Sequence, residues 1–288
     1  LSVGDDTTYT VGGTVRVFED ADSDSLNKVI LFANTSTSFL IQSGNQQDPA
    51  IFDGFSTVEE LTDFVNNIRP NPLDPQTGQG YEFGARFDFA QGKFGLNVLY
   101  FDQTRENIAR SFFVRESRVA GSDSENVLGN FQLASGEENA KGVEIGFHWN
   151  PTPNLVVLGE AQITDGKVVS NIDAPEEEGF GLIRSPEDMY TFWTMYNAPD
   201  DSSLSGFSLG LGASYNSSTR IRPQINDRFR VSDDYTMARM LVRYTWKSDK
   251  LEQQLSLNVE NLLDDEFTME DNFLSEPRIY KLAYTVRL

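Results

Sequence analysis

The last ten residues of the chain alternate between apolar and polar side chains without interruption. Every even-numbered residue from Tyr280 to Leu288 is apolar, and the odd-numbered residues from Lys281 to Arg287 are polar or small. Successive strand residues point to opposite faces, so this segment is predicted to be a strand with one apolar and one polar face. In an outer-membrane barrel the apolar face meets lipid and the polar face meets the lumen. The end of the chain therefore predicts a membrane β-barrel.

Composition agrees with a barrel and excludes several other classes. The net charge is −21 and the mean hydropathy is −0.40, and no stretch approaches the roughly 18 apolar residues of a spanning helix. The chain has no cysteine, which excludes disulfides, a thiol nucleophile and Cys-ligated metals. Its acidity argues against nucleic acid as a partner. The 12% aromatic content suits the aromatic girdles of a barrel, although a β-sandwich core would also explain it.

Similar alternation recurs along the chain and predicts about eleven strands. The predicted strands are Thr14–Phe18, Val29–Asn34, Tyr81–Phe89, Leu96–Tyr100, Val143–Trp149, Leu155–Ile163, Tyr190–Tyr196, Phe207–Tyr215, Met240–Trp246, Leu255–Val259 and Ile279–Leu288.

Short and long connections alternate between these strands. The short turns are Glu19–Lys28, Ala90–Lys93, Asn150–Asn154, Asn197–Gly206 and Lys247–Glu252, and the long loops are Phe39–Gly80, Thr104–Ala140, Thr164–Met189, Asn216–Tyr235 and Asn261–Arg278. Outer-membrane barrels have short periplasmic turns and long extracellular loops. Eleven strands cannot close a simple antiparallel barrel but are half of the 22 strands of plugged transporters. Because the chain also lacks an initiator Met and a signal peptide, we expect part of a longer protein.

Several segments resemble one family, the TonB-dependent outer-membrane receptors. Residues 255–267, LSLNVENLLDDEF, resemble the LxxNVxNLFDxxY motif before the last strand, and Pro277-Arg278 resembles the approach to that strand. Residues 32–39 with 73–84 are similar to the mid-barrel pattern YASYSxSF…LxPExGxxYExG, and Lys141–Glu144 matches the G-V-E strand opening. Leu263 and Leu288 depart from the family, which generally has Phe at both places.

The resemblance implies that residues 1–288 are a single partial domain, the C-terminal half of a 22-stranded barrel, without the plug domain and TonB box. It implies a receptor of the Gram-negative outer membrane, contacting lipid, that takes up a bulky nutrient by TonB-coupled transport. A ferric siderophore is the expected cargo; cobalamin, haem and glycans are alternatives. Neither catalysis nor a cofactor is expected.

Candidate residues for chemistry are few. His148 is the only histidine and is expected to be a polar lumen side chain, so no catalytic or metal site is predicted. Asp20–Ser25 imitates a calcium loop but has Ser25 and Leu31 where an EF-hand needs Gly and Glu, so a polar turn is expected. Glu176–Glu178 is expected to be solvated loop charge.

The first long loop carries a helix signal. Ser56–Glu59 has the form of a capping box, and Val58, Leu61, Val65 and Ile68 follow at helical spacing before Pro70. A short amphipathic helix is predicted here. We expect it to pack the loop rather than to act as a lid.

Arg220 and Arg222, in the fourth long loop, are the candidate substrate-binding residues, because guanidinium groups suit the carboxylates of an anionic chelate. A solubilising role is the alternative. Further charged residues are expected on the lumen face, to guide a substrate or brace a plug: Arg86, Glu144, Arg239, Arg243, Lys281 and Arg287.

Three other classes stay open at the level of sequence. A passive porin-like channel would share the strands and loops but lack a plug. A soluble secreted β-protein that binds glycans would bury the alternating faces in a sandwich core. An outer-membrane enzyme would need a carboxylate site, and no carboxylate pair stands out.

Overall fold

The computed structural model describes residues 7–44, 46–69, 71–172, 174–225, 228–268 and 274–287, and it leaves the side chains of 222–225 and 228–230 undescribed. Leu288, the last residue of the predicted terminal strand, lies outside the described residues, as does Pro70.

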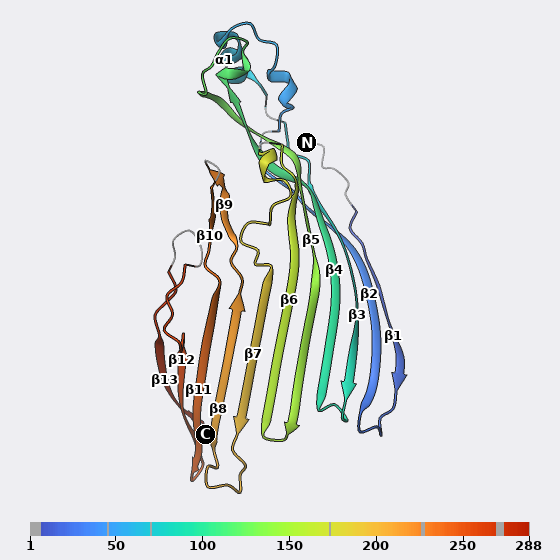
Figure 1. Ribbon diagram of the computed structural model, residues 1–288, viewed down its shortest axis with the longest axis vertical. Coiled ribbons are helices and arrows are strands. Elements are labelled where there is room, and N and C mark those ends of the chain that lie inside the picture. Colours follow the sequence, from blue (N-terminus) through green and yellow to red (C-terminus); the bar gives the residue numbers. More distant parts are fainter. Residues whose placement is uncertain are drawn as a thin grey trace.

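The chain folds into one antiparallel sheet of eleven strands, in the order β1-β2-β3-β4-β5-β6-β7-β8-β11-β12-β13 (Figure 1). All eleven predicted strands are confirmed, most of them with longer bounds. They are β1 (Thr10–Glu19), β2 (Leu26–Leu40), β3 (Gln76–Phe89), β4 (Phe94–Arg115), β5 (Val127–Thr152), β6 (Leu155–Ser170), β7 (Asp188–Asn197), β8 (Phe207–Asn216), β11 (Tyr235–Ser248), β12 (Leu251–Glu260) and β13 (Ile279–Arg287).

The register keeps the two faces separate across the sheet. Leu257 lies opposite Val242 on one side and Leu282 on the other, so apolar residues face apolar residues. One position earlier, Ser256 lies opposite Arg243. We call the side of Leu257 the apolar face and the side of Ser256 the polar face. A slip of one residue would exchange the faces, so this pattern fixes the register.

The apolar face is uncovered. Within the described residues the only other sheet is the two-stranded pair of β9 (Arg220–Ile225) and β10 (Arg228–Val231), so no second layer packs against the eleven strands. Large side chains on this face, including Phe83, Phe192 and Leu282, are 46–71% exposed. In a soluble β-sandwich these side chains would be buried in the core between two sheets, which the described residues do not form. An exposed apolar surface of this size indicates contact with a partner outside the chain.

Aromatic residues gather at both ends of the apolar face. Tyr190 stacks on Tyr215 at one end, with ring centroids 5.7 Å apart. Trp246 stacks on Tyr244 and Tyr284 at the other end, at 5.6 and 6.2 Å. Two aromatic belts bordering an apolar band are typical of a membrane barrel.

All short turns lie at one end of the sheet, together with the C-terminus, and the long connections lie at the other end, as predicted (Figure 1). We call the second end the outer end. Among the described residues, none of the helices combines the length and the apolar character that a membrane-spanning helix requires.

The long loops contain more structure than the sequence predicts. Most of Thr104–Ala140, predicted to be a loop, extends the hairpin of β4 and β5 as far as the pair Arg115↔Val127. The loop Asn216–Tyr235 contains β9 and β10. These parts were missed because strands outside a membrane have no apolar band and so lack its regular alternation.

Helix α1 (Val58–Asn67) confirms the helix predicted in the first long loop. It begins one residue later than the predicted capping box: the side chain of Thr57, not Ser56, accepts from the backbone N–H of Glu60 at 3.2 Å. The Glu60 carboxylate accepts in turn from the backbone N–H of Ser56. Three short 3-10 helices also occur, η1 (Pro49–Phe52), η2 (Glu116–Arg118) and η3 (Pro175–Glu177).

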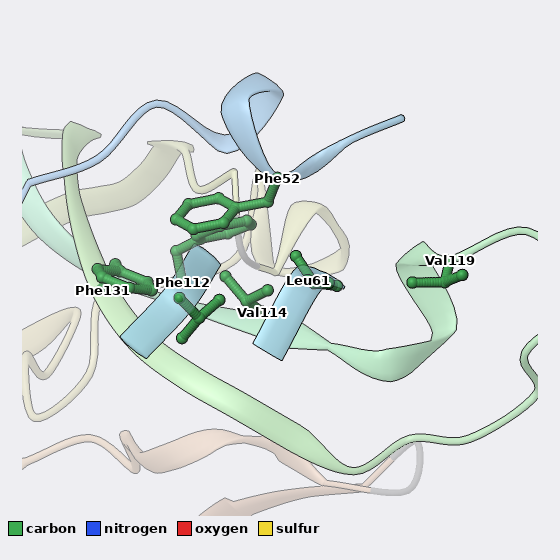
Figure 2. Packing of buried hydrophobic residues seen from close by; sticks show 7 residues of the cluster. Phe52, Leu61, Phe112, Val114, Val119 and Phe131 are labelled. Atoms are coloured by element: carbon green, nitrogen blue, oxygen red, sulfur yellow. The ribbon is translucent and has the colours of Figure 1, made fainter. Parts of the chain in front are cut away.

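Helix α1, η1 and the outer ends of β4 and β5 form a small hydrophobic core, which we call the apical unit. Phe52, Leu61 and Val114 are completely buried in it. Figure 2 shows the ring of Phe52 above those of Phe112 and Phe131, with centroid distances of 5.9 and 4.9 Å. The helix therefore packs the loop, as expected.

Candidate functional site

The polar face carries a hollow of about 510 Å³ over strands β3 to β7. Its lining includes Arg86, Asn97, His148, Glu160 and Trp193, all on the polar face. The floor is open at Gly146, where an added Cβ would meet no neighbouring atom within 4 Å. The hollow can offer charge and hydrogen bonds to a polar partner.

His148 lies on the polar face, as predicted. Its imidazole lies against the backbone of Gly95, where an added Cβ would come within 2.1 Å of the ring. The hollow that it lines also includes Asp88 and Thr191.

Metal ligands do not gather in the part of the chain that the structure describes, where no three His, Cys, Asp or Glu side chains can hold an ion together. The segment Asp20–Ser25 is a turn closed by its own hydrogen bonds, as predicted. The backbone N–H of Asp22 donates to the Asp20 side chain at 3.2 Å, and that of Ser25 donates to the Ser23 hydroxyl at 3.1 Å.

The charged residues predicted for the polar face lie on it but have different partners. Lys281 pairs with Glu260 at 2.7 Å and Arg287 with Glu252 at 3.1 Å. Arg86 lies over the ring of Phe32, with its guanidinium carbon 5.1 Å from the centroid. The other three residues lie opposite small or polar residues of the neighbouring strands: Glu144 opposite Gln162, Arg239 opposite Gly212, and Arg243 between Ser208 and Ser256.

A charged cluster joins the apical unit to the sheet. Glu138 on β5 binds Arg105 at 2.5 Å and Arg110 at 2.8 Å, both from β4. Between these arginines the register of β4 shifts, and Asn107 has a φ of 56°. The side chain of Gln42 donates to the Asn107 carbonyl at 2.6 Å. Sequence reasoning missed this cluster because polar residues in a predicted loop give no sign of their partners.

Arg220, predicted to bind substrate, is only 8% exposed. Its Nη1 donates to the Gly181 carbonyl at 2.8 Å, and its Nη2 lies 3.6 Å from a Glu177 carboxylate oxygen. These contacts tie β9 to the loop between β6 and β7. A substrate contact by Arg220 stays a prediction.

Glu177 itself corrects the expectation of solvated charge over Glu176–Glu178. It is 4% exposed and also accepts from the Asn171 side chain at 3.1 Å. A buried carboxylate needs a cationic partner, and that partner is Arg220. The side chain of Arg222 lies outside the described residues; its backbone lies in β9 opposite Arg230.

A single-layered antiparallel sheet with an apolar outer band, aromatic belts and long loops at one end defines the wall of an outer-membrane β-barrel. Residues 4–262 match the family model described as TonB dependent receptor-like, beta-barrel. The chain belongs to this family, whose members are transporters of the Gram-negative outer membrane and not enzymes.

Two curated relatives are receptors. The chain is 24% identical over 204 residues to the ferric-pyoverdine 358 receptor of Pseudomonas putida. The aligned region covers 70% of this chain and 22% of that protein. It is 24% identical over 244 residues to the metal-pseudopaline receptor CntO of Pseudomonas aeruginosa. The aligned region covers 82% of this chain and 28% of that protein. The chain thus spans about a quarter of the length of these relatives.

Solved structures show the same fold. The ferric-catecholate import receptor Fiu of E. coli K12 superposes with a TM-score of 0.66 at 19% identity, over 97% of this chain and 35% of that one. BauA, the ferric preacinetobactin receptor of Acinetobacter baumannii, gives a TM-score of 0.65 at 16% identity, over 96% of this chain and 36% of that one.

Proposed function

We propose that residues 1–288 are the C-terminal half of a 22-stranded transporter, and that the complete protein takes up a ferric siderophore or a similar metal chelate. Uptake is coupled to TonB through an N-terminal plug and TonB box outside this chain. The observation that carries the proposal is the match of residues 4–262 to the receptor barrel. The two curated relatives, receptors for ferric pyoverdine and for metal-pseudopaline, support a chelated metal as cargo.

In this proposal the chain's own residues supply a wall and a vestibule. The apolar face contacts lipid, and the sheet pairs the backbone groups that hydrocarbon cannot satisfy. The polar face, with the hollow at Arg86 and Glu160, surrounds the plug and the passing cargo. The apical unit and the hairpin of β9 and β10 extend the wall at the outer end, where cargo arrives.

The test is uptake of radioactive iron by iron-limited cells that express the full-length protein and lack other ferric receptors. A panel of ferric siderophores is supplied with and without functional TonB and a proton-motive force. We expect uptake of at least one chelate, lost when TonB is deleted or the membrane is uncoupled. Uptake that persists without TonB would identify a passive channel and contradict the proposal.

A further inference from the structure

The apolar face carries a hollow over β2 to β5, which we call the apolar furrow. Its volume is about 570 Å³, and its lining includes Leu31, Ala85 and Tyr100. The small side chain of Ala85 lies between those of Phe83 and Phe87, its neighbours on the same face of β3. The described lining consists of aliphatic and aromatic residues and one glycine. The furrow can hold a hydrocarbon chain.

A second hollow, which we call the outer recess, lies farther out on the same side of the sheet. Its volume is about 520 Å³, and its lining includes Thr37, Gln79 and Thr104. The register sets these three residues side by side across β2, β3 and β4. Gln79 lies two residues beyond Tyr81 and on the same face of β3. Polar side chains therefore replace apolar ones where this face leaves the apolar band.

The apolar furrow and the outer recess meet at two tyrosines. Tyr81 lines the recess and Tyr100 lines the furrow, and their ring centroids are 6.5 Å apart. Tyrosines of a membrane barrel gather at the level of the lipid headgroups. A single lipid with a chain in the furrow would therefore place its headgroup in the recess.

Hydrogen bonds fix one wall of the outer recess. The Asp102 carboxylate accepts from the Tyr81 hydroxyl at 2.9 Å and from the Asn139 side chain at 2.7 Å. The Asn139 side chain also donates to the Thr104 hydroxyl at 3.0 Å. Side chains that are already held in one arrangement lose little entropy when a ligand binds.

The chemistry of the outer recess distinguishes between kinds of headgroup. Three aromatic side chains line it, each 42–46% exposed: Tyr9, Phe39 and Tyr81. The residues described in its lining include the carboxylates of Asp102, Glu106 and Glu137 but no lysine or arginine. These carboxylates repel a phosphate. They suit a sugar, because sugar hydroxyls donate to carboxylates and the C–H face of a sugar ring packs on aromatic rings.

We propose that the apolar furrow and the outer recess form one binding site for a glycolipid of the outer leaflet. An acyl chain lies in the furrow, and a neutral sugar lies in the recess. The site is on the lipid side of the sheet, so it does not depend on which cargo the receptor carries.

The experiment measures lipid binding to the purified full-length receptor by native mass spectrometry, with two probes that have the same acyl chains. One is a diglucosyl diacylglycerol, whose headgroup is a neutral sugar, and the other is phosphatidylglycerol, whose headgroup carries a phosphate. The recess variant is Tyr9→Ala with Phe39→Ala. Its matched control is Tyr190→Ala, which removes a 41% exposed aromatic side chain of the outer belt that lines neither hollow.

Two single substitutions test the furrow and the charge of the recess. Ala85→Phe fills the furrow with an apolar side chain, and its control is Ala213→Phe, on the apolar face of β8 opposite Phe192. Glu106→Lys places a cation in the recess. Glu106 is exposed, so this variant keeps the fold even if the recess variant does not.

We expect the wild-type receptor to bind the glycolipid more tightly than phosphatidylglycerol. The recess variant should bind the glycolipid about tenfold more weakly, since two aromatic contacts are worth about that factor, and its affinity for phosphatidylglycerol should not change. Ala85→Phe should also weaken glycolipid binding. Glu106→Lys should strengthen phosphatidylglycerol binding, and both controls should behave as wild type.

Equal binding of the two probes by the wild-type receptor would overturn the inference, and tighter binding of phosphatidylglycerol would identify an anionic-lipid site in its place. A control variant that loses as much affinity as its partner would show a general loss of lipid contact and overturn the site. A glycolipid preference that survives both the recess variant and Glu106→Lys would place the sugar elsewhere. None of these results affects the proposed function, which iron uptake tests separately.

Discussion

Single residues on the apolar face experience a different solvent from their immediate neighbours in sequence. Leu257 faces outward between Val242 and Leu282, whereas Ser256 faces the polar side between Arg243 and Ala283. In lipid, a charge on the outward face loses its hydration, but a charge on the inward face keeps it. Introducing a charged side chain should therefore lower the free energy of unfolding more on the apolar face than on the polar face, even at neighbouring positions.

Leu257→Arg should lower the free energy of unfolding by about 2–4 kcal/mol, the cost of a cation near the bilayer midplane. Denaturant unfolding of the full-length protein refolded into lipid vesicles measures this cost. The control is Thr285→Arg, on the polar face opposite Gln254, which should cost far less. Equal losses would show that the two faces are assigned wrongly.

Two glycines of the polar face differ in the space around them. A Cβ on Gly84 would lie 2.2 Å from the Val98 carbonyl oxygen, whereas a Cβ on Gly146 would meet nothing within 4 Å. Gly84→Ala should destabilise the barrel by about 1–3 kcal/mol through overpacking. Gly146→Ala should leave stability unchanged or slightly raised, because alanine lowers the entropy of the unfolded chain. Folded and unfolded barrels migrate differently on gel electrophoresis, so heating each variant before electrophoresis gives its unfolding temperature. An equal fall in the unfolding temperature of both variants would contradict the close approach at Gly84.

At the scale of elements, the apical unit has its own core and should open independently of the sheet. Phe52→Ala should cost the unit about 3–5 kcal/mol, since it empties the centre of the core. Amide exchange of Val58–Asn67 should then become fast while exchange in β11 and β12 stays slow. Ile51→Ala, next to it but 39% exposed, is the control. Uniformly faster exchange across the sheet would contradict an independent unit.

The same scale shows what the sequence can predict. Every membrane-spanning strand was found, because burial of one face in lipid demands alternation over its whole length. Helix α1 was found because Leu61 and Val65 repeat at helical spacing behind a cap. The outer hairpins were missed, because in water their pairing leaves no such pattern. The charge of Arg220 in a loop predicted a substrate contact, which stays a prediction. Its contact with Glu177 could not be predicted, because it depends on tertiary structure.

For the molecule as a whole, the eleven strands form an open wall whose edges are β1 and β13 (Figure 1). Closure of a barrel removes both edges, so in the proposed complete protein further strands pair with β1 and β13. In that proposed barrel, lipid covers the apolar face all round, and the polar face encloses the space through which cargo would move.

The central claim is that these strands cross the outer membrane with α1 outside and the short turns inside. The chain has no cysteine, so single cysteines report position without background from this chain. Ser56→Cys lies beside α1 and Ser203→Cys lies in the turn between β7 and β8; both serines are exposed.

We would treat intact cells that express the full-length receptor with a membrane-impermeant thiol reagent. The account predicts labelling of Ser56→Cys at once, and of Ser203→Cys only after the outer membrane is permeabilised. Labelling of both in intact cells, or of Ser203→Cys alone, would contradict it.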